Sequence, residues 1–381
     1  MLFDNIDDED HKIFLDEEDE NLFDLPPQSS APPADMPTPR ATEILIGHTS
    51  IEQQLLYMLD HHRFPHGFIF SGLEGVGKSV MAYRLARYLF SKDHKSEDSS
   101  GLFGETLARP SSPTPSSSLY TSPTDPVFAR VASGGNPDLL LIERPFDEKT
   151  GRIRGSLPVE EIRKIAPFMR KTASVESGWR IVIVDDADTM TRSSQNSLLK
   201  ILEEPPEKAL LILIAHRAGA LLPTIYSRCV HIPFAPLPDD DIRRSLLGRC
   251  PDHQIPLIIS MAEGSLGAAL EYADGQHADL IGQAIGLLQD GQGLRWNDIQ
   301  IFADFFGNKG NDDSQRIFKE TMLWVASGIV RNKINGFDRL KSAPLGRKLK
   351  IHDDLRIHFD KCQSGNLDKR FLIMGAYMVF E

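Results

Sequence analysis

Cysteine is scarce in this chain, and long apolar runs are missing. The three cysteines, Cys229, Cys250 and Cys362, lie far apart and fit neither the paired spacing of a zinc site nor an even disulfide framework. This cysteine usage predicts a reducing compartment, the cytoplasm. Without a long apolar run or a charged-then-apolar start, the sequence predicts neither a membrane-spanning segment nor export.

Basic stripes with interleaved aromatic residues are also missing, which argues against strong DNA binding by this chain alone. Of the net charge of −12, residues 1–40 carry −10, because twelve acidic residues there face only Lys12 and Arg40, and the rest of the chain carries −2. Six prolines share that stretch, which has too little apolar surface to form a core. We expect a disordered acidic tail, favoured over a partner-binding peptide around Leu22–Leu25.

The most specific pattern is a glycine-rich turn between an expected strand at 66–70 and an expected helix at 80–90. Such a turn fits the phosphate-binding loop (P-loop), in which glycines let backbone N–H groups surround a phosphate. The lysine reaches the outer phosphates and the serine can bind Mg²⁺. A chance glycine-rich turn is the less favoured alternative. The residues that carry this prediction of bound ATP or ADP with Mg²⁺ are Gly72, Gly75, Gly77, Lys78 and Ser79.

A second informative stretch is an apolar strand that ends in acidic residues. Four β-branched residues at 181–184 suit a strand buried on both faces of a parallel sheet, and Asp185 and Asp186 follow at its carboxyl end. In a P-loop nucleotidase a carboxylate at this place holds Mg²⁺ against the phosphates, the role we assign to Asp185. Taken alone, the cluster fits an acidic turn equally well.

The remaining periodicity alternates apolar strands with amphipathic helices, which predicts an α/β fold with a doubly wound parallel sheet. Between them, a Ser/Pro-rich stretch after Phe90 predicts a flexible insertion. The further expected strands are 139–142, 209–215 and 230–234, and the expected helices are 51–59, 159–169 and 193–204.

After residue 235 the pattern becomes helical throughout. Short helices are expected at 241–249, 255–263 and 265–273, with Asp239 or Asp240 as the N-cap of the first. The predicted organisation is a tail at 1–40, an α/β domain at 41–235 with an insertion at 91–130, a helical lid at 236–276 and an all-α domain at 277–381.

Two further motifs carry a resemblance to a known family. Residues 196–206 are similar to the NALLKxLEEPP helix, with Ser197 in place of alanine, and Ser227-Arg228-Cys229 matches the SRC motif. With the P-loop and Asp185 in the same order, residues 42–275 resemble the AAA+ clamp-loader subunits of bacterial DNA polymerase III, most closely the delta-prime type.

The resemblance implies a RecA-like AAA+ domain, a lid and a helical collar domain in a component of the DNA polymerase holoenzyme. It implies gamma/tau and delta subunits as partners, and through them the sliding clamp and primed DNA, with no membrane. It also implies that Arg228 acts as an arginine finger on the ATP of a neighbouring subunit. Without the family, a surface arginine with a modest salt bridge is the favoured interpretation.

Three departures from the motor subunits predict weak or absent hydrolysis. Asp186 stands where they carry a catalytic glutamate, Ala215 or His216 stands at the sensor threonine, and Gly267 replaces the arginine of the lid motif. The intact P-loop keeps a gamma/tau-like motor subunit open as an alternative. A second alternative is an unrelated AAA+ ATPase, for which the SRC and LEEPP motifs would be coincidental. Because residues 80–180 contain no cysteine, we expect no zinc module of the kind found in many relatives.

Overall fold

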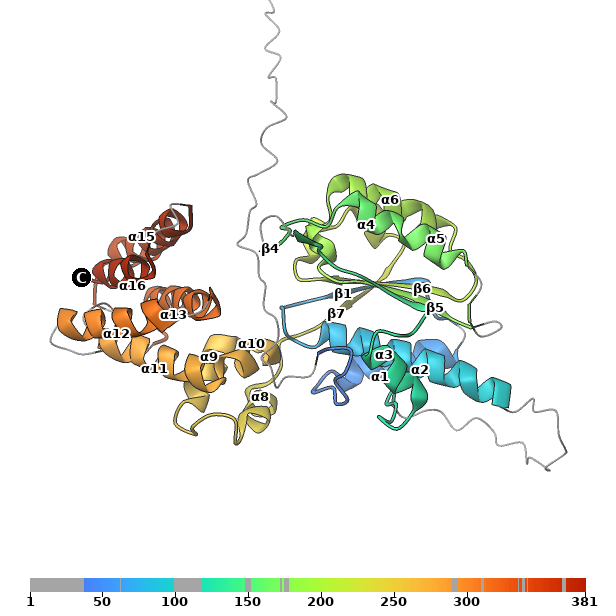
Figure 1. Ribbon diagram of the computed structural model, residues 1–381, viewed down its shortest axis with the longest axis horizontal. Coiled ribbons are helices and arrows are strands. Elements are labelled where there is room, and N and C mark those ends of the chain that lie inside the picture. Colours follow the sequence, from blue (N-terminus) through green and yellow to red (C-terminus); the bar gives the residue numbers. More distant parts are fainter. Residues whose placement is uncertain are drawn as a thin grey trace, which may run out of the picture.

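The computed structural model describes residues 38–61, 63–98, 118–147, 152–171, 173–174, 178–289, 294–309, 312–334, 336–337, 340, 342–364 and 368–381. In these residues a parallel sheet lies between two helical layers, and further helices continue from its side (Figure 1). Most of the expected acidic tail, residues 1–37, lies outside the described residues.

Five strands form the central sheet, and every pair of neighbours is parallel. Their order is β2-β5-β6-β1-β7, so the strand before the P-loop lies between β6 and β7. The strands are β1 (Gly67–Ser71), β2 (Leu139–Ile142), β5 (Arg180–Val184), β6 (Ala209–Ala215) and β7 (Val230–Pro233). The sequence therefore predicted every strand of this sheet and its parallel character.

The sheet is buried on both faces, as continuous apolar strands require. All residues of β1, β5 and β6 are buried. Alternate side chains point to opposite faces. Phe68 and Ile183 join a core that includes Leu85 of the following helix, while Ile69 and Val182 join a second core with other helices.

Helices cover both faces, with α4, α5 and α6 above the sheet and α1, α2 and α3 below it in Figure 1. The elements of this domain outside the sheet are α1 (Thr49–Asp60), α2 (Lys78–Asp98), α3 (Pro126–Ala132), α4 (Val159–Arg163), α5 (Ile165–Met169), the 3₁₀ helix η2 (Ala187–Thr189), α6 (Arg192–Glu203), the 3₁₀ helix η3 (Ala218–Ala220), α7 (Pro223–Tyr226) and the two-stranded hairpin of β3 (Phe146–Asp147) and β4 (Arg152–Ile153).

The expected insertion at 91–130 is narrower than its composition indicates. Helix α2 continues past Phe90 to Asp98, and α3 begins at Pro126 with Asp125 as its N-cap. The last residues of α2 are mostly polar and interrupt the apolar periodicity, so the sequence pattern did not predict them as helix. Residues 99–117 lie outside the described residues.

The single helix expected at 159–169 is wrong, since the structure has two short helices, α4 and α5, that meet at Lys164. Pro167 explains the break. It has no N–H to donate to the carbonyl of Arg163, and its ring disfavours a continuous helix.

Three short helices lie in the region where a lid (residues 236–276) is expected, α8 (Asp239–Leu246), α9 (Ile255–Ala262) and α10 (Leu266–Tyr272). The prediction that Asp239 or Asp240 caps α8 is wrong, because the helix begins at Asp239 and its N-cap is Pro238, in an extended conformation. The aspartates instead occupy the first turn, where negative charge opposes the positive end of the helix dipole.

Every described secondary-structure element of the C-terminal region is a helix, and the region packs beside the lid (Figure 1). Arg316 of α13 pairs with Glu271 of α10 and with Glu320, which joins the lid to this region. The helices are α11 (Gly275–Gln289), α12 (Trp296–Lys309), α13 (Asp312–Val330), α15 (Leu345–Ser364) and α16 (Lys369–Met378). The predicted fold class, a parallel α/β sheet with a helical C-terminal region, is confirmed. Across the described helices, none is both long and apolar enough to cross a bilayer.

Candidate nucleotide site

The glycine-rich turn connects the end of β1 to the start of α2, as the sequence predicts. All three motif glycines have positive φ, 143° at Gly72, 72° at Gly75 and 110° at Gly77. Residues that carry a side chain rarely adopt such backbone angles, so the loop needs glycine at these three positions. At Gly72 a Cβ would lie 2.4 Å from the carbonyl oxygen of Phe234, so a side chain there has no room.

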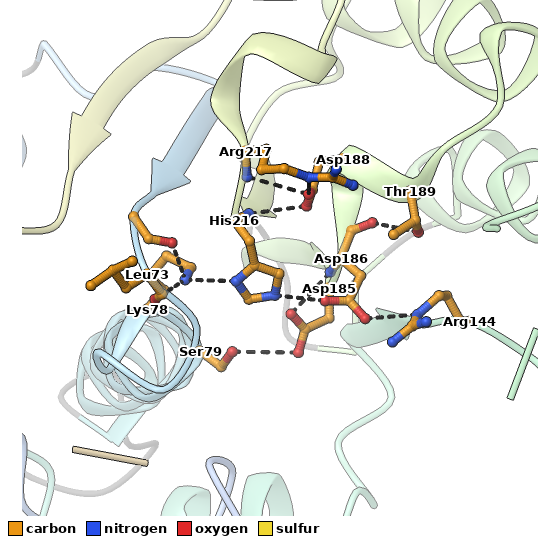
Figure 2. Close-up of polar contacts among 11 residues, drawn as sticks. Leu73, Lys78, Ser79, Arg144, Asp185, Asp186, Asp188, Thr189, His216 and Arg217 are labelled. Atoms are coloured by element: carbon orange, nitrogen blue, oxygen red, sulfur yellow. Dashed lines mark hydrogen bonds and ion pairs between the residues drawn. The ribbon is translucent and has the colours of Figure 1, made fainter. Parts of the chain in front are cut away.

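Lys78 is 3% exposed and is held by three acceptors. Its Nζ donates to the carbonyl oxygens of Gly72 (2.7 Å) and Leu73 (2.6 Å) and to Nδ1 of His216 (3.0 Å) (Figure 2). Burial lowers the pKa of Lys78 to about 8, although nearby carboxylates, Asp185 first, oppose the shift. All three N–H donors of the Lys78 ammonium group are therefore engaged by acceptors of the protein.

Ser79 and Asp185 meet beside the P-loop, as the assignment of a Mg²⁺ site requires. Ser79 Oγ donates to Asp185 Oδ2 over 3.4 Å. Burial, together with the neighbouring charge of Asp186, raises the pKa of Asp185 to about 6. A hydroxyl and a carboxylate next to the glycine-rich loop are oxygen ligands of the kind that a nucleotide-bound Mg²⁺ takes. The chemistry of these residues fits a magnesium nucleotide, for which Ser79 and Asp185 would supply the metal ligands.

Asp186 lies in the same cluster but is tied to two neighbours. Its Oδ2 accepts from Nε of Arg144 (2.8 Å) and its Oδ1 accepts from Nε2 of His216 (2.7 Å) (Figure 2). Burial alone would raise the pKa of Asp186, but the hydrogen bonds and charges of His216 and Arg144 outweigh it and lower the pKa. The backbone of Asp186 is left-handed, with φ of 51°, a conformation that aspartate tolerates better than glutamate.

His216 is the residue at the sensor position whose side chain enters the site. Ala215 is the last residue of β6 and is fully buried. The backbone N–H of His216 donates to Oδ1 of Asp188 (3.0 Å), which fixes the chain at the strand end. Burial lowers the pKa of His216, but the hydrogen bond to Asp186 outweighs this effect and the net shift is upward.

Three residues of the site were given no role from the sequence. Arg144 follows β2, Asp188 follows β5, and His48 precedes α1, where its Nε2 donates to the carbonyl oxygen of Val76 in the P-loop (3.0 Å). For Arg144 and Asp188 a signal was present, because both follow the carboxyl ends of buried parallel strands, where ligand chemistry gathers.

The lid contacts the P-loop directly. Ser265 Oγ donates to the carbonyl oxygen of Glu74 (2.7 Å), and the backbone N–H of Gly267 donates to that of Gly75 (2.9 Å). Gly267 therefore packs against the loop backbone at the position where the lid motif of motor subunits carries an arginine.

Arg228 is the one predicted site residue that the structure places away from the others. It lies between α7 and β7, and its guanidinium contacts the carbonyl oxygen of Thr224 (3.0 Å), Ser227 Oγ (3.1 Å) and Glu203 Oε1 (2.8 Å). About a third of its side chain, 34%, is exposed. Gln195 of α6 holds this segment by accepting from the N–H of Leu222 (2.7 Å).

The P-loop, the acidic end of β5, the parallel sheet and the helical lid together define a P-loop protein of the AAA+ class. Residues 122–238 match the family described as DNA polymerase III, delta subunit. The chain is 26% identical to the DNA polymerase III subunit delta' of Bacillus subtilis over 305 residues, 78% of this chain and 82% of that one. It is 31% identical to the delta' subunit of Pseudomonas aeruginosa over 45% of this chain and 44% of that one.

The resemblance inferred from the sequence is therefore confirmed, because the chain is similar to a delta' subunit over most of its length. It is also 29% identical to the gamma/tau subunit of Mycobacterium tuberculosis, over 60% of this chain and 36% of that one. The chain thus spans about a third of the length of the gamma/tau relatives it matches. A solved gamma subunit-related protein of Thermotoga maritima aligns over 86% of this chain and 98% of that one, with 18% identity and a TM-score of 0.38.

Proposed function

We propose that this chain serves in the cytoplasm as a delta-prime-like subunit of the DNA polymerase III clamp loader. It assembles with gamma/tau-like and delta-like subunits and helps to set the sliding clamp on primed DNA. Its own P-loop binds ATP or ADP with Mg²⁺, and Arg228 completes the nucleotide site of the neighbouring subunit. The match to the delta' subunit of Bacillus subtilis over 78% of the chain supports this assignment.

The position of Arg228 supports action on another chain's nucleotide. Because β7 is parallel to β1, with Val230 beside Phe68, Arg228 lies at the amino edge of the sheet. The P-loop follows the carboxyl edge, so the length of β1, about 15 Å at the usual rise per residue, separates the two. An arginine at that edge is out of reach of its own P-loop and open to a neighbour, where it can stabilise the charge of a transferring phosphate.

The proposal that this site binds nucleotide but hydrolyses it weakly rests on Asp186. A carboxylate that activates water must be free to accept the proton of that water. Both oxygens of Asp186 are engaged, by Arg144 and His216. The role left to this site is to bind nucleotide, with the glycines of the loop, Lys78 and Ser79 as ligands and Asp185 on the Mg²⁺.

Reconstitution of the loader tests the proposal. The chain is mixed with the motor and delta subunits of the same organism, and clamp-loading ATPase is measured with wild type and with Arg228→Ala. We expect intact assembly and a loss of ATPase, because hydrolysis at the one site that Arg228 completes should fall on the order of 10³-fold. Arg192→Ala is the matched control, because Arg192 is an exposed arginine at the first residue of α6, whereas Arg228 pairs with Glu203 at the last. Normal ATPase with Arg228→Ala in an assembled loader contradicts the finger role.

A motor role is the second candidate, favoured by the intact P-loop and by the gamma/tau matches. Steady-state ATPase of the isolated chain separates the two. Brisk turnover that Lys78→Ala abolishes supports a motor. Turnover near background in both proteins supports the delta-prime-like role. A chain that fails to associate with any loader subunit points instead to an unrelated AAA+ ATPase.

A further inference from the structure

The ammonium group of Lys78 has no free proton for a ligand. An ammonium has three N–H donors and no acceptor. The carbonyl oxygens of Gly72 and Leu73 take two of them, and Nδ1 of His216 takes the third. A phosphate that contacts this lysine must therefore displace one of the three acceptors.

The tautomer of His216 follows from its two partners. A lysine ammonium can only donate, so its contact with Nδ1 requires a neutral ring whose proton lies on Nε2, from which it is donated to Oδ1 of Asp186. Arg144 holds the other oxygen of Asp186, and the backbone of His216 is fixed by Asp188. The ring is thus anchored by an arrangement that does not depend on a ligand, and its acceptor nitrogen points at the lysine (Figure 2).

The two carbonyl acceptors and the ring nitrogen lie on different sides of the Lys78 ammonium group. The carbonyls belong to residues of the turn that surrounds the phosphates, whereas the ring comes from the end of β6 and lies on the side of the acidic cluster (Figure 2). A terminal phosphate that takes the place of the ring nitrogen also brings its charge toward Asp186, which is not assigned to the metal. A nucleotide without that phosphate leaves the Lys78–His216 contact in place and carries less charge toward Asp186.

We propose that His216 makes this site selective for nucleoside diphosphates over nucleoside triphosphates. It does so by competing with the third phosphate for Lys78. This inference rests on the nucleotide binding proposed above and specifies its ligand. The subunit would then hold ADP while it acts on its neighbour through Arg228.

Titration calorimetry of the full chain tests the proposal with two probes, ADP and the non-hydrolysable triphosphate AMP-PNP, each with Mg²⁺. Wild type is expected to bind ADP more tightly by about tenfold, the effect of one charged hydrogen bond. His216→Ala is expected to tighten AMP-PNP binding by a similar factor, about tenfold, and to change ADP binding little.

Two matched variants separate the ring nitrogens. An asparagine side chain offers an acceptor near the position of Nδ1, and a glutamine side chain offers a donor near that of Nε2. His216→Asn is therefore expected to keep the preference for ADP, and His216→Gln is expected to lose it while preserving the contact with Asp186. A general disturbance of the fold would affect both alike.

Several outcomes overturn the proposal. Wild type that binds both probes equally, or prefers AMP-PNP, shows that His216 does not compete with the third phosphate. Weaker AMP-PNP binding by His216→Ala shows that the ring contacts that phosphate favourably. Wild type that binds neither probe removes the proposed nucleotide site itself, and this inference with it, whereas the first two outcomes leave nucleotide binding standing.

Discussion

The backbones of Gly267 and Gly75 are in contact, which fixes the lid on the P-loop. The N–H of Gly267 donates to the carbonyl oxygen of Gly75 over 2.9 Å, and a Cβ on Gly267 would lie only 2.8 Å from the Cα of Gly75. With the lid in this position, no side chain fits at residue 267. The glycine that replaces the lid arginine of motor subunits is therefore part of a close contact and not merely the loss of a charge.

The first prediction is that Gly267→Ala separates the lid from the P-loop. The added methyl group meets backbone, which cannot rotate aside, so we expect a loss of about 1–3 kcal/mol in the free energy of unfolding. Thermal melting measures it. Gly286→Ala in α11, where an added Cβ meets nothing within 4 Å, is the matched control and is expected to be neutral or stabilising. Equal melting temperatures for the two variants would contradict a close lid contact.

The second prediction concerns the ion pair between Glu203 and Arg228. Both side chains are partly exposed, 49% and 34%, so Glu203→Gln is expected to change the free energy of unfolding by less than about 1 kcal/mol. It removes the charge that orients the guanidinium, so clamp-loading ATPase of the reconstituted loader is expected to fall, though less than with Arg228→Ala. Glu204→Gln, the exposed neighbour, is the control. Unchanged ATPase for Glu203→Gln means that Glu203 does not position the arginine.

The sequence predicted what depends on local pattern. Short runs of characteristic residue types identified the P-loop, Asp185 and all five strands of the sheet. A buried strand must be apolar throughout, and a turn that binds phosphate needs glycine. Pro167 also indicated the helix break at Lys164, but the helical spacing of apolar residues continues across 159–169 and favoured a single helix.

The sequence did not predict how distant segments meet. The partners of Asp186 come from the ends of β2 and β6, and only the strand order brings Arg144 and His216 to it. For the same reason the choice between Ala215 and His216 stayed open, since it depends on which residue leaves the strand. Strand ends in a parallel sheet show where polar residues gather, but not which of them pair.

The third prediction concerns Gln195, a buried polar residue that joins three backbone groups. Its Nε2 donates to the carbonyl oxygens of Met190 (3.2 Å) and Ala220 (3.1 Å), and its Oε1 accepts from the N–H of Leu222 (2.7 Å). Gln195→Met keeps the size but leaves these groups unpaired, so we expect a loss of about 2–4 kcal/mol in the free energy of unfolding by urea. Asn196→Ala, exposed on the same helix, is expected to change it by less than about 0.5 kcal/mol. A variant of Gln195 as stable as wild type would show that water replaces the lost hydrogen bonds.

The last prediction is that Cys229, although next to the exposed Arg228, is chemically inert. Its Sγ packs toward β1, so that a Cβ on Gly67 would lie 2.8 Å from the sulfur. Burial raises the pKa of Cys229 to about 12, against an ordinary value of 9.0. The thiolate is the reactive form, so alkylation by iodoacetamide is expected to remain slow in the folded protein up to the pH at which free thiols ionise, and to become fast in urea. The raised pKa of Cys229 also makes the stability of the fold depend on pH. As the pH rises above 9, the unfolded state loses the thiol proton that the folded state keeps. The stabilisation by the buried, protonated thiol is therefore complete below pH 9 and is lost as the pH rises toward 12. Mass spectrometry of peptides labelled at increasing pH measures the reaction site by site, and rapid labelling of Cys229 in the folded chain near neutral pH would contradict its burial.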